Sequence, residues 1–258
     1  DVEYTNPEYH YNASLYEKRV YNGWDKAEPD AELRFGPNIK DWPEMPALTN
    51  DLLVKVCSYI TDPVTTTDEL IPSGETSSYR SNPERLSEFA LSRRDPQYVG
   101  RSKVMRQIER DREAGKALPE EVMKVYEALT KAGVANDPAN TDIGSTIFAN
   151  MPGDGSAREQ AASCQRVMGA SANFAKQYAT KRYRSNVMNW GMVPFQMEAE
   201  PNFEVGDYVF VPGIRAALDG DLKDIAAYVV RADGAVEQIE LYIACLLYTS
   251  PSPRDAHE

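Results

Sequence analysis

The sequence predicts an α/β fold with mixed sheets. Short runs of branched and aromatic residues alternate with helical stretches, and one of these runs leads through a glycine turn into a helix. The chain has 258 residues, of which 42% are hydrophobic and 26% are charged. This composition is ordinary for a soluble globular protein, and the length favours one main domain. No apolar run approaches the ~20 residues that a bilayer span needs.

The first half of the chain is expected to contain a connector, a strand, a loop and two helices. Residues 1–47 are rich in turn-forming pairs and show no sustained period, which predicts an irregular connector. Residues 51–60 are dense in branched apolar side chains and predict a buried strand, whereas residues 64–83 predict a polar functional loop. Helices are expected over 103–114 and 119–132, the second ending at Gly133.

The second half begins with a strand, a turn and a helix. Residues 146–149 predict a short strand, and the glycines of Gly153-Asp154-Gly155 allow a close approach of the backbone to a ligand. The N-terminus of the following helix suits a carboxylate or phosphate. A purely structural role is the alternative for the same residues: Ser156 would cap the helix, and Glu159 would complete a capping box. Further strands are expected at 208–211, 226–230 and 236–242, the last two joined by a hairpin turn at Asp233-Gly234.

Charge and scarce residue types narrow the chemistry. The net charge of -12 argues against nucleic acid as a partner. Three cysteines without a Cys-x-x-Cys pair, Cys57, Cys164 and Cys245, cannot assemble a zinc or iron-sulfur site from this chain alone, so no metal ligands are predicted here. His10 and His257 lie near opposite ends, which excludes triads built on histidine. Catalysis must therefore depend on Asp, Ser, Arg, Lys or Tyr.

Several arginines are candidates for binding small anions, because the planar guanidinium grips carboxylates bidentately. The alternative is a set of solvated surface charges. The arginines in question are Arg80, Arg85, Arg93, Arg94, Arg158, Arg182 and Arg184.

Three segments together resemble the aconitase and isopropylmalate dehydratase superfamily. The first is Thr65-Thr66-Thr67-Asp68 with Pro72, Gly74 and Arg80-Ser81-Asn82-Pro83, and the second is the loop Gly153-Asp154-Gly155-Ser156-Ala157-Arg158-Glu159. The third comprises residues 175–179 with Asn186, Gly191 and Pro194. The resemblance covers about residues 48–242, and residues 1–47 resemble the connector that precedes this domain in single-chain aconitases.

The resemblance implies a swivelling β/β/α three-layer domain, residues 48–243, that closes over a [4Fe-4S] cluster held by other domains. Such hydro-lyases interconvert citrate and isocitrate through cis-aconitate. Ser156, Arg158 and Asp68 take the places of catalytic residues, and Arg80, Arg158 and Ala157 those of substrate-binding residues. The resemblance also implies a cytoplasmic enzyme that lacks its cluster-binding domains here, so this chain alone is expected to be inactive.

Departures from the family pattern concern the substrate more than the reaction. Glu69 stands where His is common, Ile71 where single-chain aconitases often have Ser, and Ala157 where a second Ser is usual. A branch of single-chain bacterial enzymes with the Glu form fits best. The alternatives are a separate small subunit of the isopropylmalate dehydratase type and a non-catalytic module that binds carboxylates.

Both ends of the sequence indicate an incomplete reading frame. Asp1 replaces an initiator Met, and no signal peptide follows it. Residues 245–255 resemble the translation of a sequencing adapter, so residues 244–258 are expected to be an artefactual tail. A natural Pro/Ser-rich tail is the alternative.

Overall fold

The chain divides into two units, residues 1–37 and residues 38–258. The computed structural model describes residues 3–20, 22–220 and 222–244. The first unit contains one short helix, α1 (Ser14–Glu17), which buries no residue. The second unit contains every other element and also residues 38–47. The expected artefactual tail lies outside the described residues from position 245 onward.

The centre of the second unit is a seven-stranded mixed sheet with the order β6-β5-β3-β1-β7-β8-β9. Its first four members are mutually parallel, and each of the other three runs antiparallel to its neighbour. The α/β prediction is therefore confirmed. The strands span β1 (Asp51–Ile60), β3 (Thr141–Ala149), β5 (Ala170–Ala175), β6 (Val193–Gln196), β7 (Tyr208–Val211), β8 (Ile225–Val230) and β9 (Val236–Leu241).

The sheet curls until its two edges approach each other. Gln196 at the end of β6 exchanges two backbone hydrogen bonds with Tyr242, just beyond β9, at 2.8 and 2.9 Å. This curl gives the sheet an inner face with its own core, in which Leu52 and Val54 pack with Phe174. Leu53 lies on the other face, under the helices. Alternate side chains of β1 therefore belong to two different hydrophobic cores, because successive side chains of a strand point to opposite faces.

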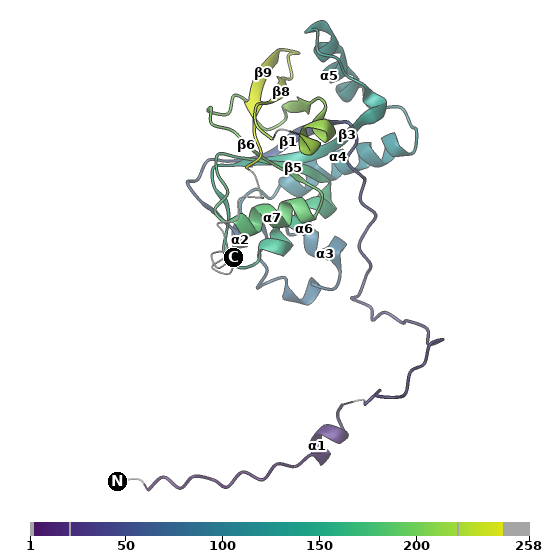
Figure 1. The fold of residues 1–258 in the computed structure, drawn as a ribbon, viewed down its shortest axis with the longest axis vertical. Helices are drawn as coiled ribbons and strands as arrows, with labels where there is room; N and C mark the ends of the chain where they lie inside the picture. The colour runs from purple at the N-terminus through teal and green to yellow at the C-terminus, as the bar shows by residue number, and fades with distance from the viewer. Residues whose placement is uncertain (1–2, 21, 221, 245–258) are drawn as a thin grey trace, which may run out of the picture. The chain divides into compact units, whose positions relative to one another are not determined.

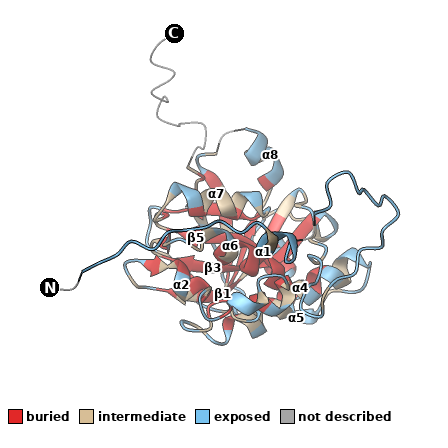
Figure 2. Ribbon diagram, turned by 90° about the horizontal axis from the view of Figure 1, so that it is seen from below, coloured by how far each residue is buried: buried red, intermediate tan, exposed pale blue. Residues whose placement is uncertain are grey.

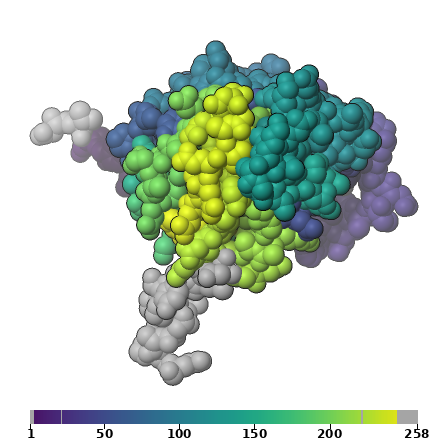
Figure 3. All heavy atoms as spheres, turned by 90° about the horizontal axis from the view of Figure 1, so that it is seen from above, coloured from purple at the N-terminus to yellow at the C-terminus, as the bar shows by residue number. Residues whose placement is uncertain are grey.

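Helices cover the outer face of the parallel strands (Figure 1). The strands beneath them are almost wholly buried, as Figure 2 shows for β3 and β5. On the opposite side, the β8–β9 hairpin forms an outer surface next to α5 (Figure 3). The helices are α2 (Thr67–Leu70), α3 (Pro83–Ser87), α4 (Tyr98–Glu113), α5 (Glu120–Lys131), α6 (Arg158–Met168), α7 (Lys181–Asn189) and α8 (Ile214–Asp219), with 3-10 turns η1 (Ser77–Tyr79) and η2 (Pro138–Asn140).

Most of the predicted elements are present, although the strand predicted at 146–149 begins at Thr141. The sequence predictions include no counterpart of α3, β5, β6, α7 or α8. Two further predictions differ. Helix α4 begins at Tyr98, five residues before the predicted start, because Tyr98 and Ser102 are buried and Ser102 Oγ donates to Met168 O at 3.0 Å. The predicted polar loop over residues 64–83 is wrong in part. It contains strand β2 (Thr65–Thr66) and helix α2, and it places Leu70 and Ile71 in the core.

Candidate functional site

A small second sheet joins two of the segments that carry the motifs. Strand β2 pairs in parallel with β4 (Pro152–Asp154), and Thr65 N–H donates to Met151 O at 3.0 Å. β2 follows the end of β1 and β4 follows the end of β3, so the pairing lies beyond the carboxyl ends of parallel strands. Ligands of open α/β sheets bind in this region.

Two glycines, Gly153 within β4 and Gly155 just after it, are required by close contacts. Gly155 has φ +132°, and a Cβ there would lie 2.2 Å from Thr67 Oγ1. Gly153 has φ +98°, and a Cβ there would lie 2.3 Å from the ring of Tyr183 on α7. A side chain at either position would push the turn away from α2 or α7. The Gly-x-Gly pattern therefore fixes the serine-bearing turn against the starts of two helices.

Helix α6 begins without a side-chain cap, so the capping-box interpretation of Ser156 and Glu159 is wrong. The N-cap is Ala157, and its side chain accepts no hydrogen bond. Ser156 is exposed, one residue outside the helix. The Glu159 carboxylate instead accepts from Trp190 Nε1 at 3.1 Å. No side chain in the described part of the chain therefore accepts from the first N–H groups of α6, and the positive end of the helix dipole faces the turn.

The two predicted carboxylate-binding arginines carry unneutralised charges. Arg158 is half-buried, and no described residue accepts a hydrogen bond from its buried Nε or pairs with its guanidinium. Arg80 is exposed beyond η1, and within the described ranges its side chain likewise has no ionic partner. Both guanidinium groups are therefore available to an anion.

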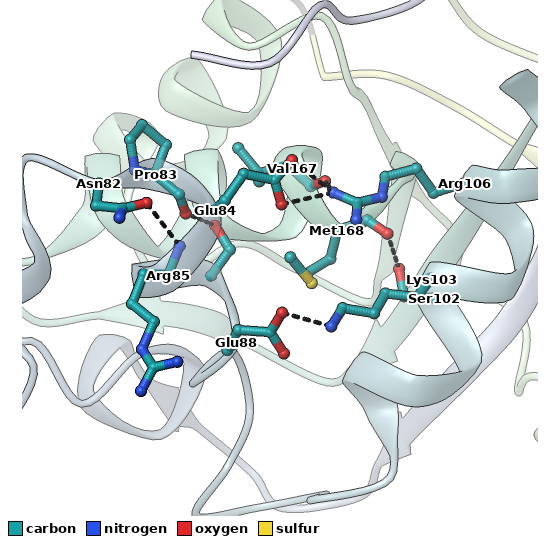
Figure 4. A network of polar contacts seen from close by, with 11 residues as sticks. Asn82, Pro83, Glu84, Arg85, Glu88, Ser102, Lys103, Arg106, Val167 and Met168 are labelled. Carbon is teal, nitrogen blue, oxygen red and sulfur yellow. Dashed lines mark hydrogen bonds and ion pairs between the residues drawn. The ribbon is translucent and has the colours of Figure 1, made fainter. Parts of the chain in front are cut away.

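The loop of Arg80 is held to the rest of the unit through α3 (Figure 4). Asn82 caps α3 by accepting from Arg85 N at 3.1 Å. Glu84 of α3 pairs with Arg106 of α4 at 3.0 Å, and Arg106 also donates to Val167 O on α6 at 2.7 Å. No contact of the described residues joins Arg80 directly to Ser156 or Arg158. Their relative position depends on the packing of α3 against α6.

Asp68 is paired with an arginine, although not with either predicted carboxylate binder. Its carboxylate forms an ion pair with Arg93, which also pairs with Glu75. Hydrogen bonding to Glu75, followed by the charge of Asp68, raises the pKa of Arg93. The neighbouring Arg94 pairs with Asp62. Sequence reasoning grouped Arg93 and Arg94 with the anion-binding arginines, but the structure uses both to hold the chain's own carboxylates.

Glu69 has a structural role at the start of α2. Its Oε2 accepts from the backbone N–H and the hydroxyl of Thr66, both at 2.8 Å, and Thr66 Oγ1 accepts from Glu69 N at 3.3 Å. This is a capping box, which the sequence signals as Thr66 followed three residues later by Glu. This capping box was not predicted from the sequence, because Glu69 was treated only as a replacement for the His of the family pattern.

No metal or cluster site is present among the described residues. Burial raises the pKa of the Cys57 and Cys164 thiols to about 12, which keeps them protonated and unsuited to ligate iron. No group of three His, Cys, Asp or Glu side chains in these ranges could hold a metal ion. The described residues therefore do not fit a [4Fe-4S] cluster. None of the described helices is both long and apolar enough to cross a membrane.

Comparisons with known proteins find similarity among solved structures. No protein-family model and no curated protein sequence matches the chain. Among solved structures, it is similar to a 3-isopropylmalate dehydratase (leuD) from Methanocaldococcus jannaschii, with a TM-score of 0.44 and 17% sequence identity over 76% of this chain and 84% of the other. A similarity at this level does not assign an activity.

Proposed function

We propose that this chain supplies the substrate-facing part of an aconitase-like hydro-lyase that acts on a hydroxy tricarboxylate. The observation that carries the proposal is the junction of the two motif segments. Pairing of β2 with β4 and the contact of Gly155 with Thr67 hold Ser156 beside an uncapped helix start. Arg158 follows two residues later and has no ionic partner in the described ranges. A hydroxyl flanked by N–H groups and a guanidinium is suited to bear negative charge.

Ser156 is the proposed base of this reaction. Its hydroxyl first loses its proton to water; the resulting alkoxide oxygen takes the proton from the carbon next to a substrate carboxylate and becomes a hydroxyl again, the electron pair of the broken carbon–hydrogen bond forms the carbon–carbon double bond, and hydroxide leaves from the neighbouring carbon. Addition of water to the double bond reverses these steps. An unperturbed serine hydroxyl is too weak an acid to lose its proton readily. Several hydrogen-bond donors are therefore needed to stabilise the negatively charged oxygen. The α6 N–H groups and Arg158 are the candidates in this chain.

The carboxylates of the substrate are proposed to bind Arg158 and Arg80. Both lack ionic partners among the described residues, unlike Arg93 and Arg94. Asp68 is proposed to act indirectly, by holding the guanidinium of Arg93 in place. Ala157 offers a methyl group where the family usually has a hydroxyl, so one substrate contact is missing. Glu69 is occupied in the capping box and is not proposed to touch the substrate.

Departure of the hydroxide needs assistance that the described residues do not provide. The resemblance implies a [4Fe-4S] cluster in the complete enzyme, and the proposal assigns it to domains outside this chain. Residues 48–243 are the proposed swivelling domain. The exposure of Ser156 and Arg80 is compatible with a substrate bound between this domain and the cluster-binding domains. The proposal predicts that this chain alone does not hydrate cis-aconitate.

Binding of an unreactive tricarboxylate tests the proposal on the chain itself. Tricarballylate should shift the amide NMR signals of residues 155–159. Arg158→Met removes a charged hydrogen-bond donor and should weaken this binding about tenfold or more. Arg110→Met is the matched control, because Arg110 is exposed on α4 and is neither in the motifs nor among the candidate anion-binding arginines. Absence of binding to the wild type, or equal binding by both variants, would overturn the proposal.

Kinetics of the full-length protein that carries this sequence test the chemistry. Ser156→Ala should lower kcat by orders of magnitude with little change in KM, because the arginines still bind the substrate. Arg158→Lys keeps the charge but loses the bidentate guanidinium geometry, so kcat should fall and KM should rise. A Ser156→Ala enzyme that retains most of its turnover would refute the assignment of the base.

A further inference from the structure

Residues 40–46, here called the strap, cross the helical face of the second unit without regular secondary structure. Three contacts attach the strap. Lys40 N–H donates to Ser81 O at 2.9 Å, the Trp42 ring packs on Trp190 with 4.5 Å between centroids, and Pro46 O accepts from Arg166 Nη2 at 2.5 Å. Beneath the portion from Pro43 to Pro46 is a pocket of about 490 Å³. The strap is therefore held at separate points rather than by continuous packing.

Two of these three attachments lie next to residues of the candidate site. Ser81 follows Arg80 directly in the chain. Trp190 is the C-cap of α7, and its Nε1 donates at 3.1 Å to Glu159, the residue after Arg158. A chain of contacts therefore runs from Trp42 through Trp190 to the first turn of α6.

Glu159 is an acidic group that could compete with a bound carboxylate. It lies in the first turn of an uncapped helix, where a carboxylate is attracted by the unpaired N–H groups and the dipole. The same N–H groups and the adjacent Arg158 are the proposed anion site. The indole N–H of Trp190 gives the Glu159 carboxylate a different partner, on α7 rather than at the turn.

We propose that Trp190, backed by Trp42 of the strap, is a positioning residue that keeps Glu159 away from the anion site. The inference depends on the proposed function, since it concerns the same carboxylate-binding turn. Trp42 is 49% exposed, and its ring packs against the ring of Trp190. Displacement of the strap would loosen Trp190 and release Glu159 to compete for the N–H groups.

The test is a double-mutant cycle with tricarballylate binding as the readout. Trp190→Phe keeps an aromatic ring and removes the donor to Glu159, so binding should weaken about two- to fivefold, the effect of one charge at a helix terminus. Glu159→Gln removes the competing charge and should bind at least as tightly as the wild type. The double variant should also bind like the wild type, because no charge remains to be held away. Trp42→Ala should weaken binding in the same direction as Trp190→Phe.

The outcomes separate this inference from the proposed function. A wild type that does not bind tricarballylate overturns both. A wild type that binds through Arg158, together with a Trp190→Phe variant of unchanged affinity, overturns only the inference. Weakened binding that Glu159→Gln does not rescue would assign Trp190 a merely structural role and also overturn it. Trp24→Phe is the control for a tryptophan substitution, since Trp24 lies in the first unit and is 82% exposed.

Discussion

Gly155→Ala directly tests whether the serine-bearing turn is seated on α2. The backbone at φ +132° costs an L-residue about 1–3 kcal/mol. The new Cβ would also lie 2.2 Å from Thr67 Oγ1, and Thr67 is only 3% exposed, so its side chain cannot swing into solvent. Overpacking of this kind costs about 1–3 kcal/mol. The expected loss in free energy of unfolding is therefore about 2–6 kcal/mol.

Urea unfolding followed by circular dichroism measures this loss, and two further variants separate its parts. Gly191→Ala is the control for backbone strain, because Gly191 has φ +74° and no atom within 4 Å of the added Cβ. It should lose about 1–2 kcal/mol. Thr67→Ala removes the clashing oxygen, so it should recover about 1–3 kcal/mol in the Gly155→Ala background. A Gly155→Ala loss no larger than that of Gly191→Ala, or no recovery in the double variant, would show that the turn does not contact α2.

Three further substitutions test features of the second unit. Glu69→Ala should cost about 0.5–2 kcal/mol and speed amide exchange in α2, because it removes the capping box, whereas Glu75→Ala breaks an exposed ion pair and should cost no more than about 1 kcal/mol. Burial, followed by the charge of Glu109, raises the pKa of Asp142 from 3.8 to about 7, so the folded state holds a proton that the unfolded chain has lost and stability falls as pH rises through this window. Asp142→Asn should flatten this dependence in urea unfolding between pH 4 and 8, and an unchanged slope would contradict the assignment. Tyr183→Phe leaves Gln165 Nε2 and Asn173 Nδ2 without the hydroxyl that accepts from them at 2.9 and 3.0 Å, so a loss of about 1–3 kcal/mol is expected, and a neutral variant would contradict these bonds.

The sequence predicted those regular elements whose signals are local. Strand β1 is a run of branched residues, and α5 has one apolar face with Gly133 at φ +78° as its stop. The start of α4 was missed because burial of Tyr98 and a hydrogen bond from Ser102 to α6 extend that helix. Such tertiary contacts leave no periodic trace in the sequence.

The candidate site was predictable as a set of residue types but not as a set of contacts. The motifs indicated Ser156, Arg158, Arg80 and Asp68, and the spacing of Thr66 and Glu69 contained a capping box. Nothing in the sequence linked Glu159 to Trp190, 31 positions apart, so the local interpretation of Glu159 as a capping residue was wrong. Likewise, the pairing of Asp68 with Arg93 spans 25 positions and depends on how the loop after α3 folds back on α2.

The exposure of the candidate site determines how its charges can act. In water, an ion pair between exposed groups contributes only about 0–1 kcal/mol, because both charges remain solvated. Arg80 and Ser156 are exposed, so carboxylate binding by this chain alone is expected to be weak and sensitive to salt. The same groups would act far more strongly once a covering surface excluded water, since the Coulomb energy rises as the effective dielectric constant falls. The competing charge of Glu159 would be strengthened equally by that closure. A residue that turns Glu159 away, as proposed for Trp190, would therefore have its greatest effect under such a covering surface.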